Sequence, residues 1–145
     1  MSTHCSIIVF DGDKFQSVYV HSDGYLTGAG RTLQQHYNTL ETALELVKEG
    51  DISRLREKCV LPGGHSFDNP TPGYTVYYGR DRGETEVSTA IHVDMKDAIQ
   101  DAQDIVYLFL MGRWLYQAAN SVAFVDLKLA LEAAELANSK RAKAA

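Results

Sequence analysis

Two runs of β-branched and aromatic residues flank an Asp-Gly pair near the start of the chain. Residues 4–10 read HCSIIVF and residues 15–21 read FQSVYVH, with DGDK between them. Asp-Gly between such runs is a strong β-hairpin signal, because glycine readily adopts the positive φ that a tight turn requires. We therefore expect antiparallel strands over 4–10 and 15–21, and any core must be built around this hairpin.

A helical pattern follows the hairpin after a glycine-rich loop. Apolar residues recur at helical spacing from 33 to 47. Asn38 or Thr39 is expected to cap a second helix within this stretch, and Gly50 to end it. Asp51 is expected to open one further helical turn over residues 51–58.

The second half of the chain alternates expected strands and helices. Residues 60–73 hold all three prolines and predict a long irregular loop, of the kind that often carries function. Residues 74–93 predict two strands around the turn RDRG, and residues 94–102 a short helix. Residues 105–118, IVYLFLMGRWLYQA, favour a hairpin over a helix because β-branched and aromatic residues dominate and Met-Gly lies at the centre. A final helix is expected over 126–139.

Together these elements predict an α+β fold. The expected order is ββ-αα-ββ-α-ββ-α, with an antiparallel sheet of hairpins and the helices packed on one face. Residues 1–139 are expected to form one domain, and residues 140–145 a basic tail without structure. The strand near 105–110 lacks polar alternation, so both of its faces should be covered. A partner subunit on the second face would do this, and we therefore expect a homo-oligomer.

Charge and hydropathy exclude several classes of protein. The 145-residue chain carries a formal net charge of -5, whereas general nucleic-acid binding needs a basic face. The longest apolar run, residues 105–111, is far too short to cross a bilayer, and no secretory signal is visible. We expect a cytoplasmic protein that does not associate with membranes, with Cys5 and Cys59 as reduced thiols.

The loop HSDGYLTGAGRT, residues 21–32, has the composition of an anion-binding site. It is not a P-loop, because five residues separate Gly24 from Gly30 and Arg31 stands where a lysine is required. Gly28 and Gly30 would let the backbone take conformations that other residues resist, and the free N–H groups of the following helix favour an anion. Arg31 could add a bidentate grip and Thr32 a hydroxyl. The alternative is a glycine-rich helix entry with a solvent-facing arginine.

His21 and Asp23 have the H-x-D spacing of some metal sites and of acid–base pairs. From an extended strand the two side chains would project to the same side. His65 and Asp68 in the long loop could complete a metal cluster, although no spacing demands it. The alternative is a histidine that hydrogen-bonds the turn at residues 22–24. We predict no metal site.

The segment YGRDRGE, residues 78–84, is the second charged motif. Arg80 and Arg82, together with Arg31, could surround a ligand that bears a phosphate or a carboxylate. Asp81 and Glu84 could instead pair with these arginines and neutralise the turn.

Aromatic residues near these motifs, Tyr25 among them, offer stacking surfaces for a base, or they pack strands and core. The serines show no nucleophile elbow, and neither cysteine lies in an activating context. We therefore predict no bound cofactor and assign no catalytic residue.

Four segments carry a resemblance to a family. They are YVHSDGYLTGAGRTLQQHY, LVKEGDISRL, HSFDNPTPG and YYGRDRGE. With the aromatic hairpin, they resemble small uncharacterised proteins of tailed bacteriophages and prophages. Relatives often carry tryptophan where this chain has Ser22. The resemblance implies a phage accessory protein acting in the host cytoplasm, where such proteins often counter host defences; it transfers no established chemistry.

Three functions follow as hypotheses. The leading one is a binder that sequesters a phosphorylated small molecule, such as a nucleotide signal, because it uses named residues. The second is an inhibitor that binds a host defence protein or CRISPR effector, in keeping with the acidic charge and the long loop. The third is an enzyme acting on a phosphate ester, with His21 and Asp23 or His65 as acid and base.

Overall fold

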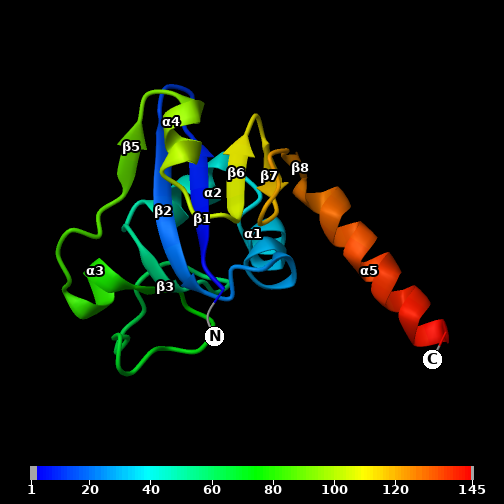
Figure 1. Cartoon of the computed structure of the whole chain (residues 1–145). Helices are drawn as coiled ribbons and strands as arrows, with labels where there is room; N and C mark the ends of the chain where they lie inside the picture. The colour runs from blue at the N-terminus through cyan, green and yellow to red at the C-terminus, as the bar shows by residue number, and fades with distance from the viewer. Residues whose placement is uncertain (1–2, 145) are drawn as a thin grey trace.

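Strands β1 (Cys5–Phe10) and β6 (Val106–Leu110) lie side by side and parallel at the centre of the sheet (Figure 1). Nearly every residue of both strands is buried. A strand covered on both faces reads as a continuous apolar run, which is how parallel strands read in α/β proteins. The missing polar alternation in these two strands therefore reports their central position.

The computed structural model describes residues 3–144, the last four by backbone alone. This part of the chain is α+β, with eight strands in one mixed, mostly antiparallel sheet. The strands run in the order β4-β3-β2-β1-β6-β7-β8, and β5 pairs with β2 beside this path. The further strands are β2 (Phe15–Ser22), β3 (Ile52–Arg54), β4 (Val76–Tyr77), β5 (Ala90–His92), β7 (Arg113–Gln117) and β8 (Val125–Asp126). The helical segments are a π-helical turn η1 (Leu26–Gly30), α1 (Arg31–His36), α2 (Leu40–Val47), α3 (Tyr78–Arg82), α4 (Met95–Gln100) and α5 (Leu127–Ala144).

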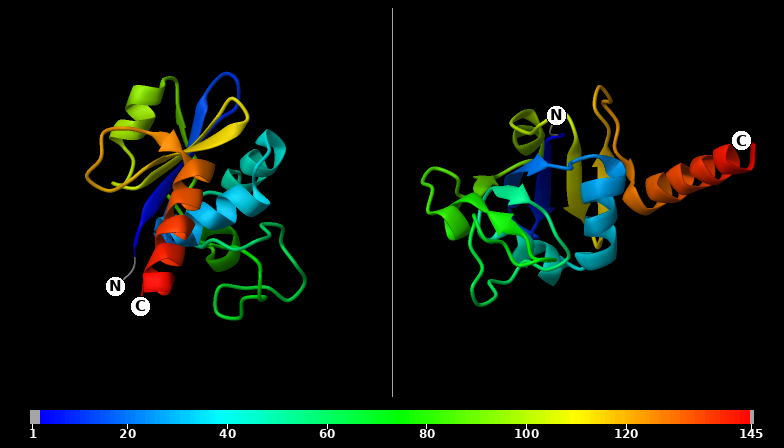
Figure 2. Two further views of the ribbon diagram at one scale, coloured as in Figure 1. Left: turned by 90° about the vertical axis from the view of Figure 1, so that its right-hand side faces the viewer. Right: turned by 90° about the horizontal axis from the view of Figure 1, so that it is seen from below.

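Helices cover both faces of the sheet, whereas the sequence predicted one. Side chains alternate between faces along a strand, so Ile7 and Ile8 enter different cores. Ile7 belongs to the larger core with residues of α1, α2 and the start of α5. Ile8 belongs to the smaller core with Ala98 of α4. Figure 2 shows α4 on one side of the strands and α1 and α2 on the other.

Several local predictions agree with the structure. β1 pairs antiparallel with β2 across the Asp-Gly turn, where Gly12 has φ +102°. β6 pairs antiparallel with β7 across Met111 and Gly112, which both have positive φ. Thr39 caps α2, and Asp94 caps α4 by accepting a hydrogen bond from the Asp97 N–H.

Two predicted elements are wrong, and the sheet is consequently not built of hairpins alone. Residues 52–54 form β3, parallel to β2, instead of a helical turn opened by Asp51. The Asp51 carboxylate accepts a hydrogen bond from the Tyr19 N–H at 2.9 Å instead. The motif YGRDR forms α3 instead of a hairpin turn, so β4 pairs with β3 and β5 with β2. In each case a strand partner distant in sequence decides the outcome, which local propensity cannot report.

The C-terminal helix is longer than the sequence predicted. α5 continues through residues 140–144, which were expected to be an unstructured tail. Alanine, lysine and arginine are strong helix formers, and this explains the extension. No helix of the described residues is both long and apolar enough to span a membrane.

β6 lacks polar alternation, which led us to expect a partner subunit on the sheet, but packing within the chain explains this pattern. Val106 and Leu108 of β6 are buried in the smaller core, which includes Ala98 of α4 and the partly buried Phe124. The second face of β6 is thus covered by the protein itself. Homo-oligomerisation remains a prediction, and the apolar character of β6 no longer supports it.

Leu108→Ala tests whether this second face is a core within one subunit. We expect a loss of about 2–5 kcal/mol in the free energy of unfolding, because the truncation leaves a cavity in the smaller core. The loss, measured by urea unfolding, should not depend on protein concentration. Val122→Ala is the control and should change stability by less than about 0.5 kcal/mol, since Val122 is 99% exposed. Equal effects of the two substitutions would contradict the assignment.

Candidate ligand-binding site

Parallel pairing brings two segments together at one edge of the sheet. Val20 pairs with Ile52 and Ser22 with Arg54, so β2 and β3 end side by side. The chain that leaves β2 (residues 23–32) and the chain that leaves β3 (residues 55–57) therefore emerge at the same edge. In sheets with parallel strands, ligands commonly bind beyond the carboxyl ends of those strands.

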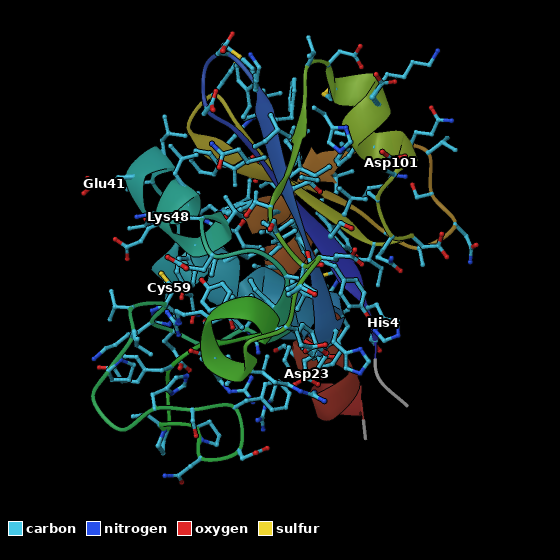
Figure 3. The ribbon with its side chains drawn as sticks, turned by 90° about the vertical axis from the view of Figure 1, so that its left-hand side faces the viewer. His4, Asp23, Glu41, Lys48, Cys59 and Asp101 are labelled. Atoms are coloured by element: carbon cyan, nitrogen blue, oxygen red, sulfur yellow. The ribbon has the colours of Figure 1, made fainter. Side chains whose placement is uncertain are left out.

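A hollow of about 220 Å³ lies at this edge. It is lined by residues of the loop after β2, of α1, and of the segment after β3. Its polar side chains carry both signs of charge and several neutral hydrogen-bonding groups: Ser22, Asp23, Tyr25, Thr27, Arg31, Thr32, Gln35, His36, Arg56 and Glu57. Figure 3 shows Asp23 toward the same end of the sheet as His4, away from Asp101.

Two guanidinium groups line the hollow and retain unused donors. Arg31 lies 3.8 Å from the Glu135 carboxylate of α5, and its side chain is 40% exposed. Arg56 donates one hydrogen bond, from Nη1 to the Leu55 carbonyl oxygen at 2.8 Å. Each guanidinium group has five N–H donors. Both groups can therefore still bind an anion in a bidentate manner.

Gly28 and Gly30 were expected to take backbone conformations that other residues resist, but neither has a positive φ, and both are required by close packing. A Cβ on Gly28 would lie 2.5 Å from the Asp23 carbonyl oxygen and 3.0 Å from the Tyr25 ring. A Cβ on Gly30 would lie 3.1 Å from Tyr107 and 3.2 Å from Leu127. These glycines hold the loop and η1 against the rest of the protein.

The expected anion site on free helix N–H groups is absent at Arg31. The helical segment begins earlier, at Leu26, so the Arg31 N–H donates to carbonyls of the π-helical turn. The Gly28 N–H donates to the Tyr25 carbonyl oxygen at 3.0 Å, and the Ala29 N–H to that of Asp23 at 2.8 Å. Thr32 Oγ1 donates to the Gly28 carbonyl oxygen at 3.2 Å. Any anion in the hollow is consequently held by side chains.

His21 and Asp23 are not brought together as a pair. Asp23 has φ +60°, which ends the extended alternation that would place both side chains on one side. The Tyr19 hydroxyl lies 2.8 Å from His21 Nδ1 and 3.0 Å from His4 Nδ1. His4 Nδ1 is 2.6 Å from the His21 carbonyl oxygen and must donate to it, since a carbonyl only accepts. His21 thus belongs to a His–Tyr–His chain, while Asp23 lines the hollow.

Arg80 is committed to a buried cluster, so the predicted gathering of three arginines around a ligand is wrong. Its Nε donates to Asp81 Oδ1 at 2.8 Å. Its Nη1 and Nη2 donate to the carbonyl oxygens of Cys59 and Thr75. His65 Nδ1 accepts the Thr71 N–H, so its Nε2–H donates to Asp81 Oδ2 at 3.1 Å. The side chains of His65 and Asp81 are fully buried, and the cluster holds the long loop 60–73 on α3.

Arg82 lies outside the hollow as well. Its guanidinium group lies 4.6 Å from the centre of the Phe67 ring and 3.7 Å from the Glu84 carboxylate. The pairing of Asp81 and Glu84 with the arginines is the alternative that the sequence left open. Among the described residues, no three metal-ligating side chains come together. Both ring nitrogens of His65 are hydrogen-bonded, one to Asp81 and one to Thr71, so His65 does not join His21 in a site.

Sequence reasoning missed Arg56, His36 and Gln35. Arg56 was assigned to a helical turn, so nothing connected it with the loop after β2. Recognition of ISR as a strand parallel to β2 is the signal that could have found it. His36 and Gln35 lie on the α1 turn that follows Thr32, on the side that borders the hollow.

Comparison with known proteins adds no relative: no family model, curated protein or solved structure matches the chain. The resemblance to phage proteins therefore remains a prediction, and function must be argued from the site alone.

Asp81→Asn tests the buried cluster. Burial acts to raise the pKa of Asp81, but hydrogen bonds from Arg80 and from the Tyr77 N–H outweigh it and hold that pKa below its usual value. A carboxyl with a depressed folded-state pKa contributes stability above its unfolded pKa of about 3.9 and loses that contribution as pH falls toward the folded value. At pH 7 we expect the variant to lose about 3–5 kcal/mol, since the amide removes the charge that pairs with Arg80 and places an NH2 donor where one of the two acceptor oxygens was.

The measurement is the free energy of unfolding between pH 2.5 and 7. The difference between wild type and variant should shrink as pH falls below about 4. Asp13→Asn is the matched control, because the Asp13 side chain is 84% exposed and pairs only with Lys14. A difference that stays constant across this range would show that Asp81 ionisation is not what stabilises the cluster.

Proposed function

We propose that this protein binds a small phosphorylated molecule, such as a nucleotide, in the hollow beyond β2 and β3. The observation that carries the proposal is the convergence of Arg31 and Arg56, with unused donors, on one hollow. A planar guanidinium group matches a phosphate with two parallel hydrogen bonds. His36 and Thr32 line the same hollow and add further polar contacts.

The acidic side chains of the hollow narrow the class of ligand. Asp23 and Glu57 line it beside the arginines, so a bare anion would meet repulsion as well as attraction. A ligand that carries hydrogen-bond donors next to its phosphate satisfies both signs. The hydroxyls of ribose and the amino groups of bases are such donors.

The size of the hollow and the position of Tyr25 are consistent with a ligand that is only partly enclosed. Pockets that enclose drug-sized ligands have about 300–1,000 Å³, whereas this one has about 220 Å³. Tyr25 is 46% exposed at its rim, and one edge of the ring packs over Gly28. The exposed part of the ring offers a base a surface for stacking, which contributes about 1–3 kcal/mol per base.

Sequestration fits these groups better than catalysis does. The acid–base hypothesis needed His21 beside Asp23 or an accessible His65, and His21 is bonded to Tyr19 whereas His65 is buried against Asp81. The setting implied by the resemblance, a phage accessory protein that withholds a nucleotide signal from its host, belongs to the same proposal.

Arg31→Ala and Arg56→Ala test the proposal. Each is expected to weaken binding about tenfold or more, because a hydrogen bond to a charged group contributes about 1.5–3 kcal/mol. Isothermal titration calorimetry with inorganic phosphate, mononucleotides and cyclic dinucleotides measures it. Arg82→Ala is the matched control and should leave affinity unchanged, since Arg82 lies against Phe67. Absence of binding across the panel, or equal binding by Arg31→Ala and wild type, would overturn the proposal.

Glu135→Gln should have the opposite effect on affinity. The Glu135 carboxylate lies 3.8 Å from Arg31 and competes with an incoming anion. Exposed pairs of this kind contribute about 0.2–1 kcal/mol, so removal of the charge should tighten phosphate binding by up to about fivefold. The gain should fall at high salt, which screens the competing pair. Weaker binding by this variant would mean that Arg31 does not contact the ligand.

A further inference from the structure

The C-terminal helix α5 extends away from the sheet into solvent (Figures 1 and 2). Only its first turns pack on the protein, through buried Leu127 and Leu131. Every residue from Glu135 to Lys140 is exposed. Isolated helices shorter than about 12–15 residues are marginal in water, so the projecting half gains little stability from its own hydrogen bonds.

The outward side of α5 carries an apolar stripe. Leu129, Ala133 and Leu136 follow the spacing i, i+4, i+7, which places them on one side of a helix. Leu127, Leu131 and Ala134 follow the same spacing on the side that faces the protein. Leu129 is 63% exposed and Leu136 is 58% exposed. This stripe is therefore a second apolar side of α5, and the described part of the chain leaves it uncovered.

We propose that this side of α5 packs against the same side of α5 in a second copy of the chain, antiparallel, with the two-fold axis at Leu136, so that Leu136 meets Leu136. The charges that flank Leu136 select this arrangement. Glu132 lies four residues before it and Lys140 four residues after it, and both side chains are exposed. A two-fold axis at Leu136 brings Glu132 of each helix to the level of Lys140 of the other, so two opposite-charge pairs form.

A parallel pairing has the opposite consequence. In register, it would set Glu132 against Glu132 and Lys140 against Lys140, and like charges at such short range repel. Both arrangements set Leu136 against Leu136, and only the antiparallel one also pairs Glu132 with Lys140.

The dimensions of the helix permit this dimer. Ala144 lies eight residues beyond Leu136, which is about 12 Å at 1.5 Å per residue. The end of one helix therefore reaches the level of residue 128 of the other, where α5 leaves its own sheet. The overlap covers the projecting half of both helices, and the two sheets lie at opposite ends of the pair.

Dimerisation leaves the ligand hollow open. Glu135 precedes Leu136 by one residue and therefore points about 100° away around the helix axis. It faces Arg31 on the inner side. The dimer and the anion site thus use different sides of α5 and can be tested separately.

Charge reversal tests the pairing. Sedimentation equilibrium of the full chain should show a dimer, and Glu132→Lys and Lys140→Glu should each raise the dissociation constant at least about tenfold. Each single reversal turns two attractions into two repulsions. The double variant, Glu132→Lys with Lys140→Glu, restores both pairs and should return the constant to within about threefold of wild type.

The control is Lys96→Glu on α4, an exposed lysine outside α5, which should leave the dissociation constant unchanged. Circular dichroism and urea unfolding of each variant separate loss of association from loss of folding. A wild-type chain that stays monomeric up to 1 mM, single reversals without effect, or a double variant as weak as the singles would each overturn the proposal.

Discussion

Two parallel strands cannot be joined by a tight turn; a crossover of a dozen or more residues is required. Between β2 and β3 this crossover consists of η1, α1 and α2, and its apolar residues fill the larger core. The Tyr107 hydroxyl donates to the Gly24 carbonyl oxygen at 2.8 Å and fixes the point where the crossover begins. Trp114 Nε1 donates to the Tyr37 carbonyl oxygen at 2.8 Å and fixes the end of α1. The position of Arg31, and with it the candidate site, depends on this arrangement.

The arginines of the protein fall into two groups. Some have their N–H donors hydrogen-bonded within the fold, and others keep donors that a ligand could use. Arg80 donates to Asp81 and to two backbone carbonyls, within a cluster in which the side chains of Asp81 and His65 are fully buried. A buried guanidinium group in this state stabilises only as long as its partners stay in place. Arg31 and Arg56 are at the sheet edge and keep their donors. Burial and satisfaction of hydrogen bonds, more than the identity of the residue, thus decide which arginine can bind.

The two proposals place ligand binding and dimerisation toward opposite ends of the strand order. β2 and β3 carry the hollow, and β7 and β8 lead into α5, which offers the surface for a second copy. Arg31 and Glu135 are the one described ion pair between these regions. An anion bound by Arg31 would release Glu135 from this contact, on the side of α5 that the second copy does not use.

The sequence by itself determined what depends on neighbours along the chain. The sequence predicted the Asp-Gly and Met-Gly turns, the Thr39 and Asp94 caps, and the burial of residues 105–110. It could do so for the turns and caps because φ preferences and capping hydrogen bonds act over a few residues. Even at the candidate site, the four lining residues Asp23, Tyr25, Arg31 and Thr32 come from one loop that the sequence singled out. Tertiary structure alone decided that ISR pairs with β2, that Arg56 joins Arg31, and that His65 and Arg80 are sealed by Asp81. Such contacts join residues distant in the chain, and their free energy depends on burial and geometry that exist only once the sheet has formed.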